Sequence, residues 1–153
     1  MTKQSWVLVL ITMAVLSGAF QFYSPKVVDP DSFYHITHAK IYRAEGMTFG
    51  EFPWVQFSVI KDIKADIWYG FHLFLIPFTY IKGDILNIKI AGVVITFLTL
   101  TGFYWVLTRL KIIWPLVWTL FFTLAAPDVL YRLTMARPHN LTLVLVLAAF
   151  AFM

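Results

Sequence analysis

The sequence contains no cysteine and few charged residues. The lack of cysteine excludes a disulfide framework, a thiolate nucleophile and a thiolate metal site. Charged residues make up only 13% of the chain, whereas a soluble domain typically has about 25%. The net charge of +4 comes without a dense Lys/Arg block, so we expect no nucleic-acid partner.

Apolar residues, in contrast, make up 60% of the chain and aromatic residues 18%. Several apolar runs are long, and tryptophan and tyrosine often stand near their ends, as they do at membrane–water interfaces. Only helices and closed barrels satisfy the backbone inside lipid, and runs of this length are typical of helices. The composition therefore predicts an all-α fold, a polytopic transmembrane helical bundle with the lipid bilayer as its surroundings.

The apolar runs divide the chain into predicted spans and polar segments. The segment 67–81 is short for a crossing and contains a histidine and a proline, so we expect it to be interfacial or re-entrant. Residues 24–66 are polar enough to leave the bilayer and are predicted to form an amphipathic external loop. The predicted spans cover about residues 6–22, 85–107, 112–126 and 139–153.

The sequence supports a separate prediction at each end of the chain. Lys3, the following apolar run and the small residues 17–19 are also typical of a cleaved signal peptide, which is the alternative to a first span. The aromatic residues at 20–23 favour the span. The last apolar run reaches residue 153 without a polar segment after it, which predicts that residues 1–153 are the N-terminal part of one longer membrane domain.

Two polar segments, residues 27–66 and 128–138, are predicted to lie on the same side, opposite the N-terminus. Lys3 and the basic pair after the second span favour this orientation under the positive-inside rule, whereas Arg132 and Arg137 speak against it. If residues 67–81 cross the membrane, the second segment moves to the other side.

The sharpest motif is Asp-Pro-Asp-Ser-Phe-Tyr-His at residues 29–35. Asp29 followed by proline predicts a helix start, with the aspartate as N-cap. Asp29 and Asp31 are candidates for a general base and for ligands of a divalent metal, Mg or Mn. A purely structural helix cap is the alternative. In the helix that follows, residues at spacings of three and four share one face: Asp31, His35, His38, Tyr42 and Glu45.

Other polar residues have simpler interpretations. Asp62 and Asp66 alternate with lysines, which favours a solvated charged turn. His72 stands among aromatic residues and is interpreted as a packing histidine. Asn140 opens a glycosylation sequon, but it starts an apolar helix, and we interpret the match as chance.

Arg132, Arg137 and His139 lie at the start of the last apolar run. Charge at such a position is costly and tends to be kept for a partner. A phosphate suits it, because a guanidinium binds phosphate through two hydrogen bonds and a helix N-terminus adds positive charge. The alternative for either arginine is an extended side chain that reaches the lipid headgroups.

The order of these features resembles the N-terminal part of the GT-C glycosyltransferases, the multispan enzymes that use polyprenyl-phosphate-linked sugars. Both the oligosaccharyltransferase catalytic subunits and the protein mannosyltransferases are similar to it. The matching features are a first span, the acidic motif at 29–35, a helix ending near Glu45-Gly46, Phe52-Pro53-Trp54, Trp68-Tyr69-Gly70 and Ile76-Pro77-Phe78, followed by paired spans.

This resemblance implies an inverting glycosyltransferase in the plasma (inner) membrane, moving a sugar from a polyprenyl-phosphate donor to an acceptor at the outer face. It implies that Asp29 is the general base or a metal ligand, that Asp31 is its acidic partner, and that Arg132, Arg137 and His139 contact the donor phosphate. His35 is added as a binding residue by extrapolation. The chain departs from the oligosaccharyltransferases after Asp128, where basic residues replace further acidic ones, and it lacks the acceptor-binding domain.

The alternative, from another class, is a transporter or a non-catalytic membrane subunit. A transporter would place ionisable residues in the middle of its spans. Here they cluster near the boundaries of the loops, which favours an interfacial enzyme.

Overall fold

The computed structural model describes residues 3–47 and 65–152, and throughout these ranges the regular structure is helical, with no strand. The prediction of an all-α fold is confirmed for this part of the chain. The Phe52-Pro53-Trp54 motif and Asp62 lie outside the described residues. The helices are α1 (Lys3–Phe22), α2 (Asp31–Glu45), α4 (Tyr69–Leu75), the 3-10 helix η2 (Ile76–Tyr80), α5 (Asp84–Arg109), α6 (Pro115–Leu124), α7 (Pro127–Leu133) and α8 (Pro138–Phe152).

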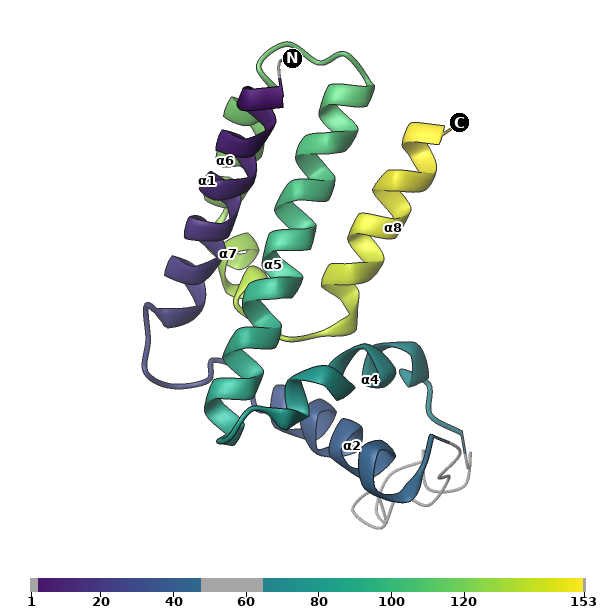
Figure 1. The fold of residues 1–153 in the computed structure, drawn as a ribbon. Coiled ribbons are helices and arrows are strands. Elements are labelled where there is room, and N and C mark those ends of the chain that lie inside the picture. Colours follow the sequence, from purple (N-terminus) through teal and green to yellow (C-terminus); the bar gives the residue numbers. More distant parts are fainter. Residues whose placement is uncertain (1–2, 48–64, 153) are drawn as a thin grey trace.

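Helix α5 is the centre of the fold, with α1 and α8 packed beside it (Figure 1). Two glycines of α5 permit these close contacts. A Cβ atom on Gly92 would lie 2.6 Å from the side chain of Gln21 on α1, and one on Gly102 would lie 2.6 Å from Val144 on α8. Small residues at such positions let helix backbones approach closely.

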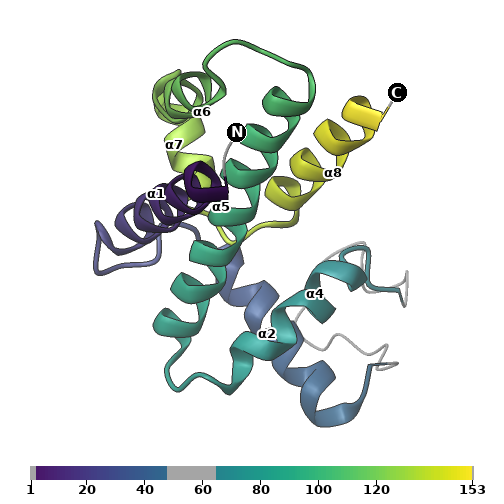
Figure 2. The same ribbon diagram turned by 45° about the horizontal axis from the view of Figure 1, so that its top comes forward.

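Helices α2 and α4 form a second layer across one end of this bundle, and the N- and C-terminal ends of the chain lie at the other end (Figures 1 and 2). The two helices pack on each other, and their apolar side chains continue into the end of α5. The buried core at this junction consists of Ile36, Ala39, Phe71, Leu75, Ile88, Ala91, Ile95 and Ala136. A second core joins α1, α5 and α7 through Val9, Met13, Leu100, Tyr104 and Leu133.

Lys89 fixes the end of α1 against α5. Its side chain is buried, and its ammonium group donates to the carbonyl oxygens of Gln21, at 2.9 Å, and Ser24. A cation is favourable at the C-terminal end of a helix, where carbonyl oxygens lack partners within the helix. This buried charge therefore lies near a helix end and not in the middle of α5.

The segment after α5 differs from the sequence prediction. A single span was expected over 112–126 and a loop from Asp128, whereas the structure has the short helix α6, a break, and a second helix, α7, bent by 96° from the first. Pro127 explains the break, because proline cannot donate the backbone hydrogen bond that would continue α6, but it suits the first turn of a new helix. α6 alone is too short to cross a bilayer.

One described helix, α5, is long and apolar enough to cross a membrane, and the bent pair α6 and α7 passes the same test only together. The apolar helices Trp6–Phe22 and Pro138–Phe152 are shorter. Segment 67–81 forms α4 and η2, neither of which has the length of a span, and its interfacial or re-entrant position stays a prediction.

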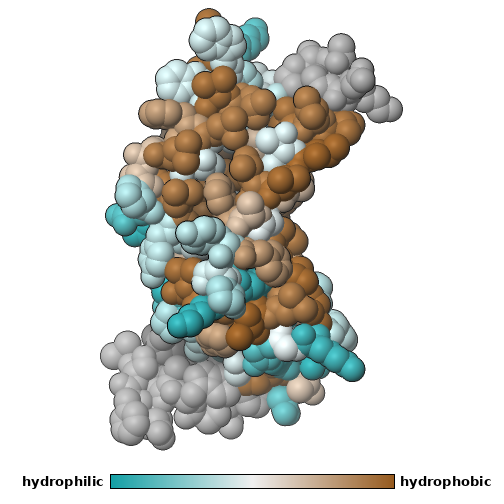
Figure 3. Space-filling model, turned by 90° about the vertical axis from the view of Figure 1, so that its left-hand side faces the viewer, coloured by the Kyte–Doolittle hydropathy of each residue, from teal (hydrophilic) through white to brown (hydrophobic). Residues whose placement is uncertain are grey.

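Large apolar side chains cover much of the outer surface of the helices around α5. Figure 3, which views the molecule from the α1 side, shows them over much of the upper part of this face, with polar residues gathered toward the lower part. On α1 the exposed side chains include Leu8 and Val15, at 66% and 64% exposure, and on α8 they include Leu145 and Phe150, at 70% and 62%.

Candidate functional site

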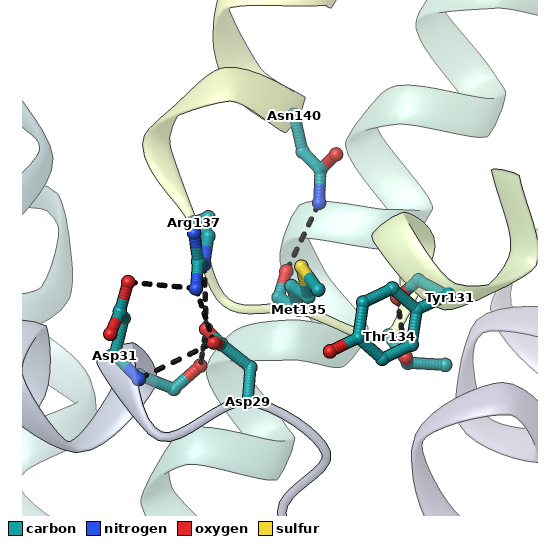
Figure 4. A network of polar contacts seen from close by, with 8 residues as sticks. Asp29, Asp31, Tyr131, Thr134, Met135, Arg137 and Asn140 are labelled. Atoms are coloured by element: carbon teal, nitrogen blue, oxygen red, sulfur yellow. Dashed lines mark hydrogen bonds and ion pairs between the residues drawn. The ribbon is translucent and has the colours of Figure 1, made fainter. Parts of the chain in front are cut away.

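The site is built around Arg137, which joins the two polar segments of the chain. Its Nε donates to Asp29 Oδ2 at 2.8 Å and its Nη2 to Asp29 Oδ1 at 2.5 Å, across a sequence separation of 108 residues (Figure 4). The same Nη2 lies 2.7 Å from Asp31 Oδ2. The contact brings residues of the segments 27–66 and 128–138 together, and the prediction that both segments lie on the same side of a membrane stays a prediction.

Asp29 also organises the start of α2. Its carboxylate accepts hydrogen bonds from the backbone N–H of Asp31 at 3.3 Å and the hydroxyl of Ser32 at 3.1 Å. The helix begins at Asp31, with Pro30 at its N-cap, one residue later than the sequence predicted. Burial by itself would raise the pKa of Asp29, but the hydrogen bonds from Arg137 and Ser32 and the positive charge of Arg137 hold it below its ordinary value.

A cavity of about 340 Å³ opens beside this ion pair. Asp31 enters its wall with a side chain that is 58% exposed, whereas Asp29 is 1% exposed and lies behind it. His139 also lines the cavity, and its Nε2 is buried and has no hydrogen-bond partner in the described part of the chain. The full lining is Asp31, Tyr34, His35, Trp68, Arg137, Pro138 and His139.

A second cavity, of about 460 Å³, adjoins the first through two shared residues, Trp68 and Pro138. It runs between α4 and α8 and is mostly apolar. Its other lining residues are Ile67, Gly70, Phe71, Leu141, Thr142 and Leu145. A polar cavity thus lies next to an apolar groove, an arrangement suited to a ligand with a charged head and a hydrocarbon tail.

Of the predicted binding residues, the structure brings His35, Arg137 and His139 together with Asp31. Arg132 is not among the residues that line the cavity, and it is exposed on α7. Its backbone carbonyl accepts a hydrogen bond from Asn140 at 2.8 Å, which fixes the turn between α7 and α8. Its role in phosphate binding stays a prediction.

The predicted Mg or Mn site at Asp29 and Asp31 does not fit the arrangement of these residues. Both oxygens of Asp29 already accept hydrogen bonds from Arg137, and Asp31 contacts the same guanidinium group. A metal ion between the two carboxylates would occupy the place of this cation. Nothing in the described part of the chain adds a third carboxylate there, so we derive no step through a metal at this position.

A second polar cluster lies between α2 and α4, and the sequence prediction missed its two main members. Asp66 was predicted in a solvated turn and His72 as a packing residue. Instead, Asp66 Oδ2 lies 2.5 Å from Nδ1 of His72, and His72 Nε2 lies 2.8 Å from Nδ1 of His35. The hydroxyl of Tyr42 donates to Asp66 Oδ2 at 2.9 Å.

The sequence feature that could have indicated this cluster is the position of Asp66 just before an apolar helix. Its Oδ1 accepts the backbone N–H of Trp68 at 2.9 Å, as an aspartate does in an Asx turn. This turn fixes the carboxylate just before α4, with His72 on that helix. Asp66 is therefore buried and paired, although Asp62 and Asp66 together resemble a charged surface turn.

Burial sets the protonation of this cluster. It lowers the pKa of His35 to about 3, with further lowering by His72 and Arg137, and it lowers the pKa of His38 to about 4, with a further contribution from His72. Burial by itself would raise the pKa of Asp66, but the hydrogen bonds from His72 and Trp68 hold it below its ordinary value. At pH 7, His35 and His38 are neutral and Asp66 is ionised.

Comparisons of this chain with models of protein families, with curated proteins and with solved structures each found no match.

Proposed function

We propose that this chain belongs to a membrane glycosyltransferase that moves a sugar from a polyprenyl-phosphate-linked donor to an acceptor. The observation that carries the proposal is the pair of adjacent cavities, one lined by Asp31, Arg137 and His139 and the other mostly apolar. A donor of this kind has a sugar, a phosphate and a long hydrocarbon chain. The polar cavity suits the sugar and the phosphate, and the apolar groove suits the hydrocarbon chain.

The exposed apolar surface supports a membrane location. α5 alone has the properties of a span, but a buried helix of a soluble protein can have them too. The outer faces of α1, α6 and α8 are a stronger argument, because they carry many large exposed apolar side chains and soluble proteins rarely expose apolar patches of more than a few hundred Å². A multi-pass bundle with this surface in contact with lipid follows as part of the proposal.

In the reaction, Asp31 acts as the general base. Its carboxylate takes the proton of the acceptor hydroxyl or amide while the acceptor atom forms a bond to C1 of the sugar, and the bond between C1 and the phosphate oxygen breaks. Arg137 and His139 stabilise the negative charge on the leaving phosphate. Asp29 holds Arg137 in position and, being buried, does not itself reach the acceptor.

The charge distribution favours an enzyme over a transporter. Lys89 and Arg137 lie near the ends of the apolar helices α5 and α8, Asp29 and Asp31 lie at the start of the polar helix α2, and no charged side chain occupies the middle of α5 in the described structure. A transport path would require such groups near the midplane of the bilayer.

The test is sugar transfer from a labelled polyprenyl-phosphate donor by membranes containing the product of the complete reading frame. Asp31→Asn should lower the rate by about 100-fold or more, since general base catalysis contributes 10² to 10⁴. Asp84→Asn is the matched control, because this carboxylate is also half-exposed and paired with a cation, Lys40, but lies outside the cavity. Equal rates in wild type and Asp31→Asn would move the interpretation to a transporter or a non-catalytic subunit.

A further inference from the structure

Three side chains with metal-binding atoms meet between α2 and α4, apart from the cavity of the proposed reaction. His38 comes from α2, Asp66 precedes α4 and His72 lies on α4. One ligand atom from each lies within 4.8 Å of the other two. Asp66 Oδ2 is the central atom, 2.5 Å from His72 Nδ1 and 3.8 Å from His38 Nε2.

This cluster is shielded from water. The side chains of His38, Asp66 and His72 are 1%, 3% and 0% exposed. The two imidazole rings lie face to face, with centroids 4.2 Å apart and an interplanar angle of 14°. An ionised carboxylate in such surroundings is costly unless a cation or several hydrogen-bond donors neutralise it.

The spacing suits a small ion of the zinc type. Two ligands of a tetrahedral Zn²⁺ lie about 3.3 Å apart, because Zn–N and Zn–O bonds are about 2.0–2.2 Å long. The two observed separations from Asp66 Oδ2, 2.5 Å and 3.8 Å, lie on either side of this value. Binding would need these two separations to change by less than about 1 Å, and it would need the two rings to tilt toward each other.

Neighbouring groups already orient the ligands as a metal site requires. A histidine ligand usually donates its second ring N–H to an acceptor, and Nε2 of His72 lies 2.8 Å from Nδ1 of His35. The other oxygen of Asp66 accepts the N–H of Trp68.

We propose that His38, Asp66 and His72 bind one divalent ion, Zn²⁺ or a related first-row metal, which links α2 to α4. Two nitrogen ligands and one carboxylate are typical of zinc and related first-row metals, whereas Mg²⁺ and Ca²⁺ prefer oxygen ligands throughout. The fourth position belongs to water or to the Tyr42 hydroxyl, which contacts the same carboxylate oxygen. Through His72, the ion also sets the orientation of His35 in the cavity wall.

The experiment measures the zinc content of the purified full-length protein in detergent, after chelator treatment and dialysis against Zn²⁺. The wild type should retain one Zn²⁺ per chain, and Asp66→Asn and His38→Ala should each lose it. His139→Ala is the matched control, since it removes a histidine outside the cluster, and it should keep the ion. Co²⁺ in place of Zn²⁺ should give the visible absorption of a tetrahedral nitrogen and oxygen site.

A second measurement separates loss of the site from loss of the fold. Zn²⁺ should raise the melting temperature of the wild type and of His139→Ala by several degrees, and should leave that of Asp66→Asn unchanged. A folded wild type that binds no Zn²⁺, or a zinc content that is equal in wild type and Asp66→Asn, would overturn the proposal and leave these residues as a hydrogen-bonded triad. Both readouts are independent of sugar transfer.

Discussion

Replacing Asp29 by asparagine should destabilise the protein much more than the same change at Asp31. The side chain of Asp29 is 1% exposed and forms two hydrogen bonds to Arg137, whereas Asp31 contacts the same group but is 58% exposed. Breaking a buried ion pair costs about 3–5 kcal/mol, and exposed pairs contribute at most about 1 kcal/mol. Since Arg137 is 30% exposed and keeps Asp31, we expect a loss of about 2–3 kcal/mol for Asp29→Asn.

The assay is denaturant unfolding of the purified protein in a mild detergent, with Asp29→Asn, Arg137→Gln and the double variant as a cycle. A coupling energy of about 2 kcal/mol is expected between Asp29 and Arg137, because Arg137→Gln leaves Asp29 buried without its counter-charge, whereas Asp29→Asn leaves the partly exposed Arg137 with Asp31 alone. The change Asp31→Asn should cost less than about 1 kcal/mol. Equal losses for Asp29→Asn and Asp31→Asn, or a coupling energy near zero, would refute the assignment of Asp29 as the structural partner.

The pH dependence of the stability difference between wild type and Asp29→Asn gives an independent check on the role of Asp29. The pKa of Asp29 lies below its ordinary value in the folded protein, because hydrogen bonds and charge from Arg137 outweigh the effect of burial. Its contribution to stability is therefore present above the unfolded value near 3.8 and is lost as the pH falls through the lower folded value. The difference between wild type and Asp29→Asn should stay constant from pH 7 to about pH 5 and shrink below about pH 4.

Four further substitutions test the packing and the cavity. Gly102→Ile should lower the free energy of unfolding by about 1–3 kcal/mol, because the added side chain meets Val144 on α8, whereas Gly70→Ala enters open space and should be neutral or raise it by up to about 1 kcal/mol. Lys89→Met should cost about 1–3 kcal/mol by leaving the carbonyl groups at the end of α1 without their donor. Arg137→Lys keeps the positive charge but removes the bidentate hydrogen bonding of the guanidinium group. In the transfer assay we therefore expect KM for the donor to rise about tenfold.

The sequence was sufficient for the features that depend on local pattern. Apolar runs and their flanking residues located α1 and α5 within a few residues, and the Asp-Pro pair located the start of α2 within one. The bend between α6 and α7 was missed because composition does not distinguish one apolar helix from two. Pro127 was the available signal, since proline suits the first turn of a new helix.

The site could be predicted only in part, because pairing between distant residues depends on how the helices pack. Asp29, Asp31 and Arg137 were all identified as candidates, but not that Asp29 and Arg137 bind each other across 108 residues. Asp66 and His72 were assigned ordinary roles, since their neighbours in sequence suggest a charged turn and an apolar segment. Asp66 and His72 form a polar cluster because α2 packs over them and brings His35 and His38 close to them.

The group formed by Asp29, Asp31 and Arg137 has a consequence for the binding of any anion. Two carboxylates and one guanidinium carry a net charge of −1 when all are ionised, so the cavity wall is not a permanently positive surface. A phosphate that approaches Arg137 must displace Asp31 from the guanidinium, because both anions would use the same Nη2 group. Donor binding should therefore break the contact between Asp31 and Arg137, which leaves this carboxylate free to take the acceptor's proton.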